Sequence, residues 1–157
     1  MTKSSSFDRP AALQLALACD LAEVRLTAQM VRRFLSAQNC AEGDLMDCEL
    51  ALVEACNNAV QYAAENARHL PVGVEVICGP QQIEMRVTDH TAGFEWPERA
   101  PLPDVEHERG RGVYLIQSLM DRVQFTCHET ENVLVLLKQR RQNEPTRVRK
   151  SKSGGGC

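Results

Sequence analysis

Residues 51–64, with the sequence ALVEACNNAVQYAA, decide the fold because they combine helical composition with polar residues at a fixed spacing. Alanine, leucine and glutamate all favour a helix. At 100° per residue, Asn58 lies about 40° from Glu54 around the helix axis, and the apolar residues gather on the opposite side. The stretch therefore predicts a helix over about residues 45–66, with one face on a core and a carboxylate and an amide on the other.

The chain before this helix predicts a strand and a first helix. Residues 12–18, ALQLALA, favour a strand. Asp20 can cap a helix over about residues 21–38, and Glu23 three positions later completes a capping-box-like pair. The apolar residues of that helix recur at the spacing of a single core-facing stripe, namely Val24, Ala28, Val31 and Leu35.

The chain after the central helix predicts two hairpins. Residues 72–78 and 83–89 alternate apolar and polar side chains and are joined by a Gly-Pro turn. Residues 123–129 and 133–138 form a second such pair around a short polar turn.

Between the hairpins, residues 90–111 contain three prolines and no periodicity, which predicts a long loop. A third helix is expected to begin near Gly112 and to cover residues 113–123. The element order β-α-α-β-β-loop-α-β-β predicts the α+β class: a two-layer sandwich, in which one mostly antiparallel sheet is covered on one face by helices.

The charge of the chain is unevenly distributed. The sequence has 18 basic and 21 acidic residues, yet seven of the basic residues lie at or after Lys138, which leaves residues 1–137 with a net charge near −9. Such an acidic body argues against direct nucleic-acid binding. No run of 18 apolar residues and no signal peptide is found, so we expect a cytoplasmic protein that does not bind a membrane.

Composition also predicts the limits of the folded domain. The 157 residues suit one domain, which we place at residues 11–138, after a flexible N-terminus at 1–10 and before a disordered basic tail at 139–157. The seven cysteines show no metal-binding spacing. We expect six of them to be buried apolar side chains, and Cys157 to be exposed.

Three short patterns carry candidate chemistry. Glu54 and Asn58 pair a potential base with a ligand for a hard cation. Asp89 ends a strand before a turn that contains Gly93. Gly110 and Gly112 precede a helix, where backbone amides can accept phosphate charge. Each pattern alone also fits an ordinary solvated surface or turn, and the glycines are not a Walker A loop, because no Gly-Lys-Ser/Thr follows.

Taken together and in this order, the patterns resemble the N, G1 and G2 boxes of the GHKL (Bergerat) ATP-binding fold. The resemblance places the boxes at residues 54–58, 89–93 and 110–116 and extends over residues 12–138. Within that superfamily, the segments LVEACNNAVQYA and RGRGVYLIQSLMDRV resemble small bacterial serine-protein kinases that also act as anti-sigma factors.

The resemblance implies a role for each matching residue. Asn58 would hold Mg²⁺ on the ATP phosphates, and Glu54 would be the catalytic base for a serine or threonine hydroxyl of a partner protein. Asp89 would accept a hydrogen bond from the adenine amino group, and Gly93 would leave space for the base. Residues 94–111 would form a lid over the nucleotide.

The phosphate end of the implied site lies at the start of the third helix. There the glycines would let the chain wrap the phosphates, and the implied nucleotide-binding set is Arg109, Gly110, Arg111, Gly112 and Val113. Arg109 or Arg111 would supply positive charge to the phosphates, or both would be solvated on the lid; the residues favour neither alternative over the other.

Several positions depart from the family pattern. Thr91 stands where the G1 box usually has its first glycine, which predicts a turn less free to adopt positive φ. Gln61 and Tyr62 stand where a Lys-His pair is frequent near the phosphates. These departures bear on catalytic rate more than on nucleotide binding. The single tryptophan, Trp96, is expected to pack on the core.

The resemblance predicts an ATP- and Mg²⁺-dependent serine/threonine kinase that phosphorylates a STAS-type anti-sigma-factor antagonist. It also implies sequestration of a sigma factor, with phosphorylation switching the partner that is held, and a homodimer. The alternative is a binding module that keeps nucleotide and regulates by sequestration only. Glu54 favours the kinase, because only phosphoryl transfer needs a base.

Overall fold

A computed structural model of the chain describes residues 9–92, 96–101 and 108–142. Within these ranges, five strands and three α-helices follow one another, and a 3₁₀ turn, η1 (Glu65–Ala67), lies in the connection between α2 and β2. In chain order the elements are β1 (Ala11–Leu17), α1 (Leu21–Ala37), α2 (Glu42–Gln61), β2 (Val72–Cys78), β3 (Gln82–Asp89), α3 (Glu108–Leu119), β4 (Arg122–Cys127) and β5 (Asn132–Gln139).

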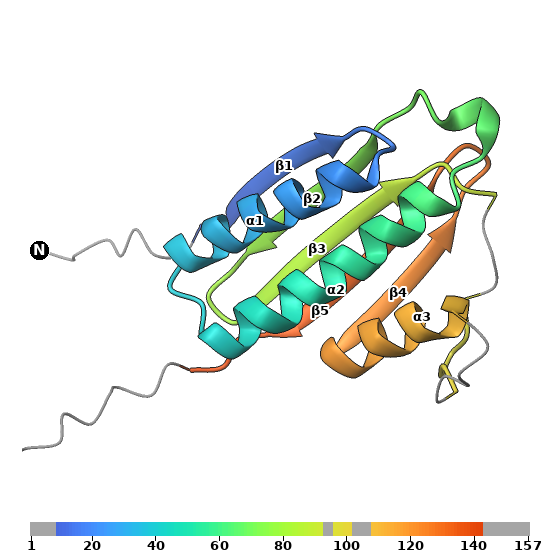
Figure 1. Cartoon of the computed structure of the whole chain (residues 1–157). Coiled ribbons are helices and arrows are strands. Elements are labelled where there is room, and N and C mark those ends of the chain that lie inside the picture. The colour runs from blue at the N-terminus through green and yellow to red at the C-terminus, as the bar shows by residue number, and fades with distance from the viewer. Residues whose placement is uncertain (1–8, 93–95, 102–107, 143–157) are drawn as a thin grey trace, which may run out of the picture.

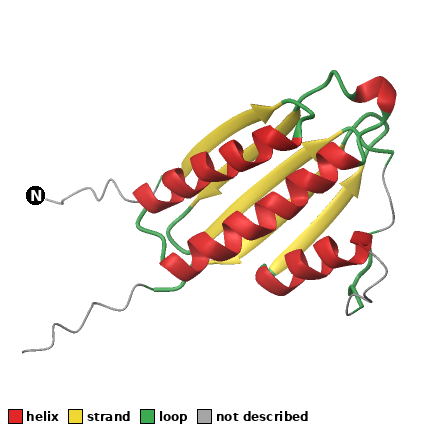
Figure 2. Ribbon diagram, viewed as in Figure 1, coloured by secondary structure: helices red, strands yellow, loops and turns green. Residues whose placement is uncertain are grey.

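The strands form one sheet in the order β1-β2-β3-β5-β4, and every neighbouring pair is antiparallel. The three helices lie side by side on one face of this sheet, with α2 in the middle, between α1 and α3 (Figure 1). The same view coloured by secondary structure shows the two layers, helices in front of strands (Figure 2). The predicted α+β sandwich is confirmed.

The core lies between the two layers and follows from the alternation in the strands. In β2 and β5, every second side chain faces the helices and is buried. The central helix α2 is buried along Leu45, Cys48, Leu52, Ala55 and Ala59, the apolar set expected from its spacing. Large side chains with almost no exposed surface fill this core, among them Leu17, Leu35, Leu52, Ile83, Met85, Ile116 and Leu136.

The first helix begins as its sequence predicts. The Asp20 side chain accepts a hydrogen bond from the backbone N–H of Ala22 at 2.9 Å, so Asp20 is the N-cap of α1. The Glu23 carboxylate turns back and accepts the N–H of Ala18 at 2.9 Å. These contacts fix the corner between β1 and α1.

The ends of α2 differ from the prediction of residues 45–66. The helix begins three residues earlier, at Glu42, so Gly43 lies in its first turn. It ends at Gln61, because the backbone of Ala63 pairs with Thr91, beyond the end of β3. A long-range contact, invisible to local propensity, therefore sets where α2 stops.

The ends of α3 differ in the same way. It covers Glu108–Leu119 where residues 113–123 were predicted. Past Leu119 the chain joins the sheet instead, because the N–H of Asp121 donates to the carbonyl of Leu137 at 2.9 Å and β4 starts at Arg122.

The expectation that a disordered tail begins at Gln139 is wrong for the first residues of that segment. Gln139 belongs to β5. Arg140 donates from its guanidinium to the carbonyls of Gly79 and Gln38 at 2.8 and 2.7 Å. Arg141 contacts the first turns of α2. Residues 1–8 and 143–157 lie outside the described part.

The expected burial of the cysteines is confirmed for Cys40, Cys48, Cys56 and Cys78. It is wrong for Cys127, which is exposed at the end of the edge strand β4, and Cys19 is half-buried. Cys157 lies outside the described residues. Among the described residues, no helix is both long and apolar enough to cross a membrane.

Candidate functional site

The helix α2 carries Glu54 and Asn58 one turn apart, and both are half-buried. The neighbouring positions Ala55 and Ala59 are buried in the core. Because small alanines face the sheet, α2 sits close to it while the carboxylate and the amide point away from the core. This is the arrangement predicted from the periodicity of residues 51–64.

The first turns of α3 lie against these two side chains. A Cβ atom added to Gly112 would be 3.1 Å from Glu54 Oε2 and 3.3 Å from Asn58 Nδ2. These distances are tighter than nine in ten real contacts of a Cβ, so an alanine at this position would fit only if the ends of these two side chains shifted by a few tenths of an ångström. The structure thus brings the predicted N-box and G2-box residues into direct contact.

The third predicted residue, Asp89, is held by three hydrogen bonds to one oxygen. Its Oδ1 accepts from the N–H of Thr91, from the hydroxyl of Thr91 and from the Nδ2 of Asn132, each at 3.0 Å. Every hydrogen bond that the described residues donate to this carboxylate goes to Oδ1. The side chain is therefore fixed in orientation while Oδ2 keeps its acceptor capacity.

Thr91 replaces a glycine of the family pattern without backbone strain. In the described part of the chain, Asn39 is the single non-glycine residue with positive φ, so the turn at Thr91 does not need the conformation that favours glycine. The Thr91 hydroxyl supplies one of the donors to Asp89 instead. The turn therefore accommodates threonine, and its lower freedom to adopt positive φ stays a prediction.

The two halves of the site meet at one end of the sheet. The isolated bridge between Ala63 and Thr91 joins the chain just after α2 to the turn just after β3. In Figure 1 the C-terminal end of α2, the end of β3 and the start of α3 lie at the same end of the molecule. The topology thus brings the segments that carry Glu54, Asp89 and Gly112 to one end of the molecule, although they are far apart in sequence.

The G2 glycines lie inside α3, not in a loop before it. The helix starts at Glu108, which puts Gly110 and Gly112 in its first two turns. Glycine costs a helix only about 1 kcal/mol relative to alanine, and the close packing of Gly112 on α2 gives a reason to accept that cost. Val113 is buried and Arg111 is exposed. Gly93 and the side chain of Arg109 lie outside the described residues.

Gln117 holds the described part of the predicted lid by two hydrogen bonds. Its amide accepts the N–H of Ala100 at 2.7 Å and donates to the carbonyl of Pro97 at 2.9 Å. Trp96 stacks on Phe125 of β4, with ring centroids 5.7 Å apart and planes inclined by 22°. The expected core packing of Trp96 is confirmed.

Asn132 and Gln117 are functional candidates that the sequence did not reveal. Asn132 is buried, and its Nδ2 also contacts the carbonyl and hydroxyl of Thr91 at 3.0 and 3.1 Å. It stands directly opposite Asp89 in the pairing of β3 with β5. Only the strand register links the two residues. The one available signal is a polar residue directly before the apolar run of residues 133–137.

The donor set fits a magnesium nucleotide. Asn58 and Glu54 offer an amide oxygen and carboxylate oxygens, which are the hard ligands that Mg²⁺ prefers. The close approach at Gly112 leaves no Cβ between them and the start of α3, where helix N–H groups favour negative charge. Oxygen ligands for a cation thus lie beside a helix start suited to phosphate.

Comparison with known proteins places this site in a family. The model of the family described as the histidine kinase-like ATPase domain matches residues 17–138. The serine-protein kinase RsbW of Bacillus licheniformis is 30% identical over 116 residues, a match that covers 67% of this chain and 72% of that protein. RsbW of Bacillus subtilis (strain 168) is 29% identical over 94 residues, which cover 54% of this chain and 59% of that protein.

Two solved structures share the fold. The RsbU and RsbW domains of Rv1364c from Mycobacterium tuberculosis match with a TM-score of 0.64 and 15% identity, covering 84% of this chain and 33% of that chain. A chain of the SiaB–SiaC complex from Pseudomonas aeruginosa matches with a TM-score of 0.62 and 14% identity, covering 86% of this chain and 93% of that chain. This chain belongs to the histidine kinase-like ATPase domain family, within the GHKL-fold group of bacterial serine-protein kinases and anti-sigma factors.

Proposed function

We propose that the chain is an ATP- and Mg²⁺-dependent serine/threonine protein kinase that phosphorylates a STAS-type anti-sigma-factor antagonist in a partner switch. The observation that carries this proposal is the contact of Gly112 with both Glu54 and Asn58. It joins a base and a metal ligand to the helix start where phosphates would lie. The similarity to RsbW kinases supports the same activity.

In this proposal each side chain of the binding site has one task. Asn58 would hold Mg²⁺ through its amide oxygen. Asp89 would accept the adenine amino hydrogen at Oδ2, since Oδ1 is engaged by Thr91 and Asn132. The first turn of α3 would bind phosphate oxygens through its N–H groups, and Gly93 and the lid residues Arg109 and Arg111 complete the proposed set.

Glu54 would act on the protein substrate. Bound ATP supplies the phosphoryl group, and the chain must accept the proton of the attacking hydroxyl. The Glu54 carboxylate is half-buried, one helical turn from the proposed metal ligand Asn58, and it borders the start of α3. A carboxylate there can orient a serine hydroxyl and take its proton as the phosphoryl group is transferred.

The alternative proposal keeps nucleotide binding and partner sequestration without transfer. It is favoured by one feature, the pair Gln61 and Tyr62, which replaces the Lys-His pair frequent in the family and removes that cation from the end of α2. Arg111 is exposed and would have to supply the charge to phosphate. A sigma factor and a second copy of the chain remain proposed partners in both cases.

The deciding experiment is transfer of labelled γ-phosphate from Mg-ATP to a STAS-type antagonist protein. The wild-type chain should label the antagonist, and Glu54→Gln should bind ATP and antagonist with little change but transfer at least about a hundredfold more slowly. Glu65→Gln, which changes a carboxylate that is 93% exposed and lies outside α2, in η1, serves as the matched control.

Equal transfer by the Glu54→Gln variant would remove the proposed base. Binding of ATP and antagonist by the wild type without transfer would instead support the sequestration module.

A further inference from the structure

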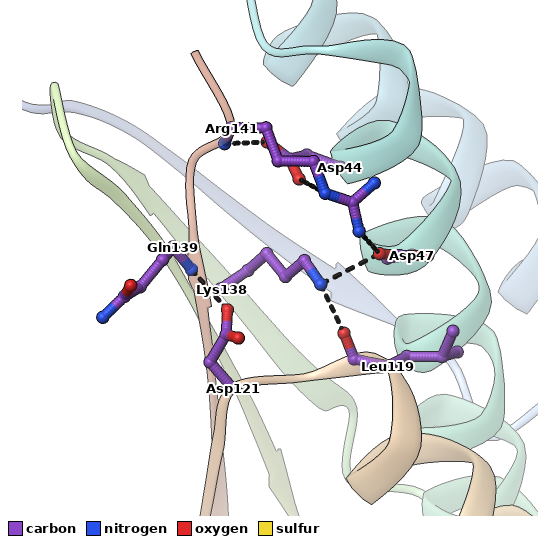
Figure 3. Close-up of polar contacts among 7 residues, drawn as sticks. All are labelled: Asp44, Asp47, Leu119, Asp121, Lys138, Gln139 and Arg141. Atoms are coloured by element: carbon purple, nitrogen blue, oxygen red, sulfur yellow. Dashed lines mark hydrogen bonds and ion pairs between the residues drawn. The ribbon is translucent and has the colours of Figure 1, made fainter.

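Lys138, near the end of β5, joins two helices at the end of the molecule opposite the candidate site. Its Nζ lies 2.9 Å from Oδ2 of Asp47 on α2 and donates at 2.7 Å to the carbonyl of Leu119, the last residue of α3. Figure 3 shows the ammonium group pointing between these two partners. The contact therefore links β5, α2 and α3 through one atom.

The burial of this ion pair makes its partners obligatory. The Lys138 side chain is 8% exposed and that of Asp47 is 20% exposed. A buried ammonium group must be paired and hydrogen-bonded, because its desolvation is otherwise uncompensated. A terminal helix carbonyl is a suitable second acceptor, since it carries the negative end of the helix dipole. The geometry thus fixes the C-terminal end of α3.

The other end of α3 is the candidate site. Seven residues separate Leu119 from Gly112, which is ~10 Å of helix at 1.5 Å per residue. On α2 the same number of residues separates Asp47 from Glu54. The two helices are therefore in contact at both ends, by Lys138 at one and by Gly112 at the other. A short helix moves as a rigid body, so a change at the first end shifts the second.

We infer that Lys138 is a positioning residue for the nucleotide site. Its contacts with Asp47 and with the end of α3 fix where Gly112 lies against α2, although Lys138 itself touches no site residue in the described part of the chain. The inference rests on the proposed nucleotide site and adds a residue that the sequence placed at the border of a tail.

Arg140 provides a matched control two positions later in the same segment. Its guanidinium donates to the carbonyls of Gln38 and Gly79, which joins the end of α1 to the β2–β3 turn. It is likewise a basic side chain with structural contacts, but its guanidinium makes no hydrogen bond to α3 among the described residues. Loss of Arg140 should reduce the stability of the fold without displacing Gly112.

The test is a calorimetric titration of Mg-ATP into the full chain, with unfolding curves measured in parallel. We expect Lys138→Met to weaken nucleotide binding about two- to thirtyfold in protein that is still folded. Arg140→Met should lower the unfolding midpoint and leave the dissociation constant unchanged. A purely structural role of Lys138 would give the two variants the same pattern, and that result would overturn the inference.

A second variant covers the case in which Lys138→Met does not fold. Asp47 also pairs with Arg141 at 2.9 Å, so it keeps one cation in Lys138→Met. In the double variant Lys138→Met/Asp47→Asn, the charges of Lys138 and Asp47 are removed together, Arg141 keeps its ion pair with Asp44, and the contact with the carbonyl of Leu119 is still lost. It should bind Mg-ATP as weakly as the single variant; wild-type affinity in the folded double variant would contradict the positioning role.

The wild-type titration separates the two proposals. If the wild-type chain fails to bind Mg-ATP, the proposed function is wrong and the positioning role falls with it. If the wild type binds and the folded Lys138 variants bind equally well, only the positioning role is wrong.

Discussion

Asp89 owes its fixed orientation to two side chains from different parts of the fold. Thr91 gives two hydrogen bonds from the following turn, and Asn132 gives one from the facing strand β5. Asn132 also accepts at Oδ1 from the thiol of Cys127 at 2.9 Å, which holds its amide in one orientation. A carboxylate held in this way is prepared for a ligand before the ligand arrives, so little ordering is needed on binding.

At the residue scale we predict that Asn132→Leu weakens ATP binding about tenfold. The substitution keeps the size of the side chain but removes the donor that fixes Asp89, and a hydrogen bond to a charged group contributes about 1.5–3 kcal/mol. Thr91→Val is the milder comparison, because the N–H of residue 91 still reaches Asp89. Titration with ATP gives both affinities; equal binding by all three proteins would show that Asp89 needs no such support.

A second residue-scale prediction concerns Cys56, which points into the core two positions after Glu54 on α2. Burial raises the pKa of its thiol from the ordinary value of 9.0 to about 12. The unfolded chain therefore loses this proton near pH 9, whereas the folded chain keeps it up to about pH 12. The stabilisation is complete below pH 9 and is lost as the pH rises toward 12.

Urea unfolding at pH 8 and pH 10 measures this effect. The wild type should lose about 1 kcal/mol more stability between the two values than Cys56→Ala, in which the thiol is absent. Other groups that titrate in this range are common to both proteins and cancel in the difference. A parallel pH dependence of the two proteins would mean that the thiol ionises equally in the folded state.

At the scale of elements, α3 shows why a glycine can be kept inside a helix. Gly112 has Glu54 and Asn58 within reach of an added Cβ, whereas no described residue has a heavy atom within 4 Å of a Cβ added at Gly110. Alanine raises the helix propensity at either position. A difference between the two variants therefore reports the effect of the contact at Gly112.

We predict that Gly110→Ala stabilises the chain by about 0.5–1 kcal/mol, because alanine replaces glycine in an open helix position. Gly112→Ala should gain less stability and lose more phosphate transfer, since its Cβ displaces the side-chain ends of Glu54 and Asn58. Thermal unfolding and the transfer assay measure the two effects. Identical behaviour of the two variants would show that the contact at Gly112 has no functional weight.

The sequence predicted elements better than their ends. The strands at residues 72–78 and 83–89 agree with β2 and β3 within one residue, because alternation is a local signal. The end of α2 depends on the bridge from Ala63 to Thr91, which no local pattern contains. The site followed the same rule: Glu54 and Asn58 share a helix face and were found, whereas Asn132 meets Asp89 only through strand register.

At the scale of the whole molecule, the residues that follow β5 connect the sheet to the helix layer. Arg141 donates its N–H to the fully buried Asp44 at 2.7 Å and pairs with Asp47 at 2.9 Å, both in the first turns of α2. Its guanidinium lies where a Cβ on Gly43 would be, 2.1 Å from Nη1. Figure 3 shows the Arg141 side chain reaching Asp44 and Asp47 at the start of α2.

This arrangement predicts different effects for two truncations. Removal of residues 143–157 leaves every contact of Arg140 and Arg141 in place and should leave the free energy of unfolding nearly unchanged. Removal of residues 140–157 leaves Asp44 buried without its cation, which should cost about 3 kcal/mol or more. Denaturant unfolding of the two proteins checks the difference; equal stability would show that these arginines do not fasten α2.

A single site for a magnesium adenine nucleotide, formed by α2, β3 and α3, is best tested by a calorimetric titration of the wild-type chain with ATP and with GTP. We predict saturable binding of ATP that weakens when EDTA removes Mg²⁺, and little binding of GTP, which has a carbonyl where adenine offers its amino group to Asp89. Asp89→Asn should weaken ATP binding, because an amide replaces the carboxylate acceptor. Absence of saturable ATP binding, or equal binding of ATP and GTP, would contradict the account.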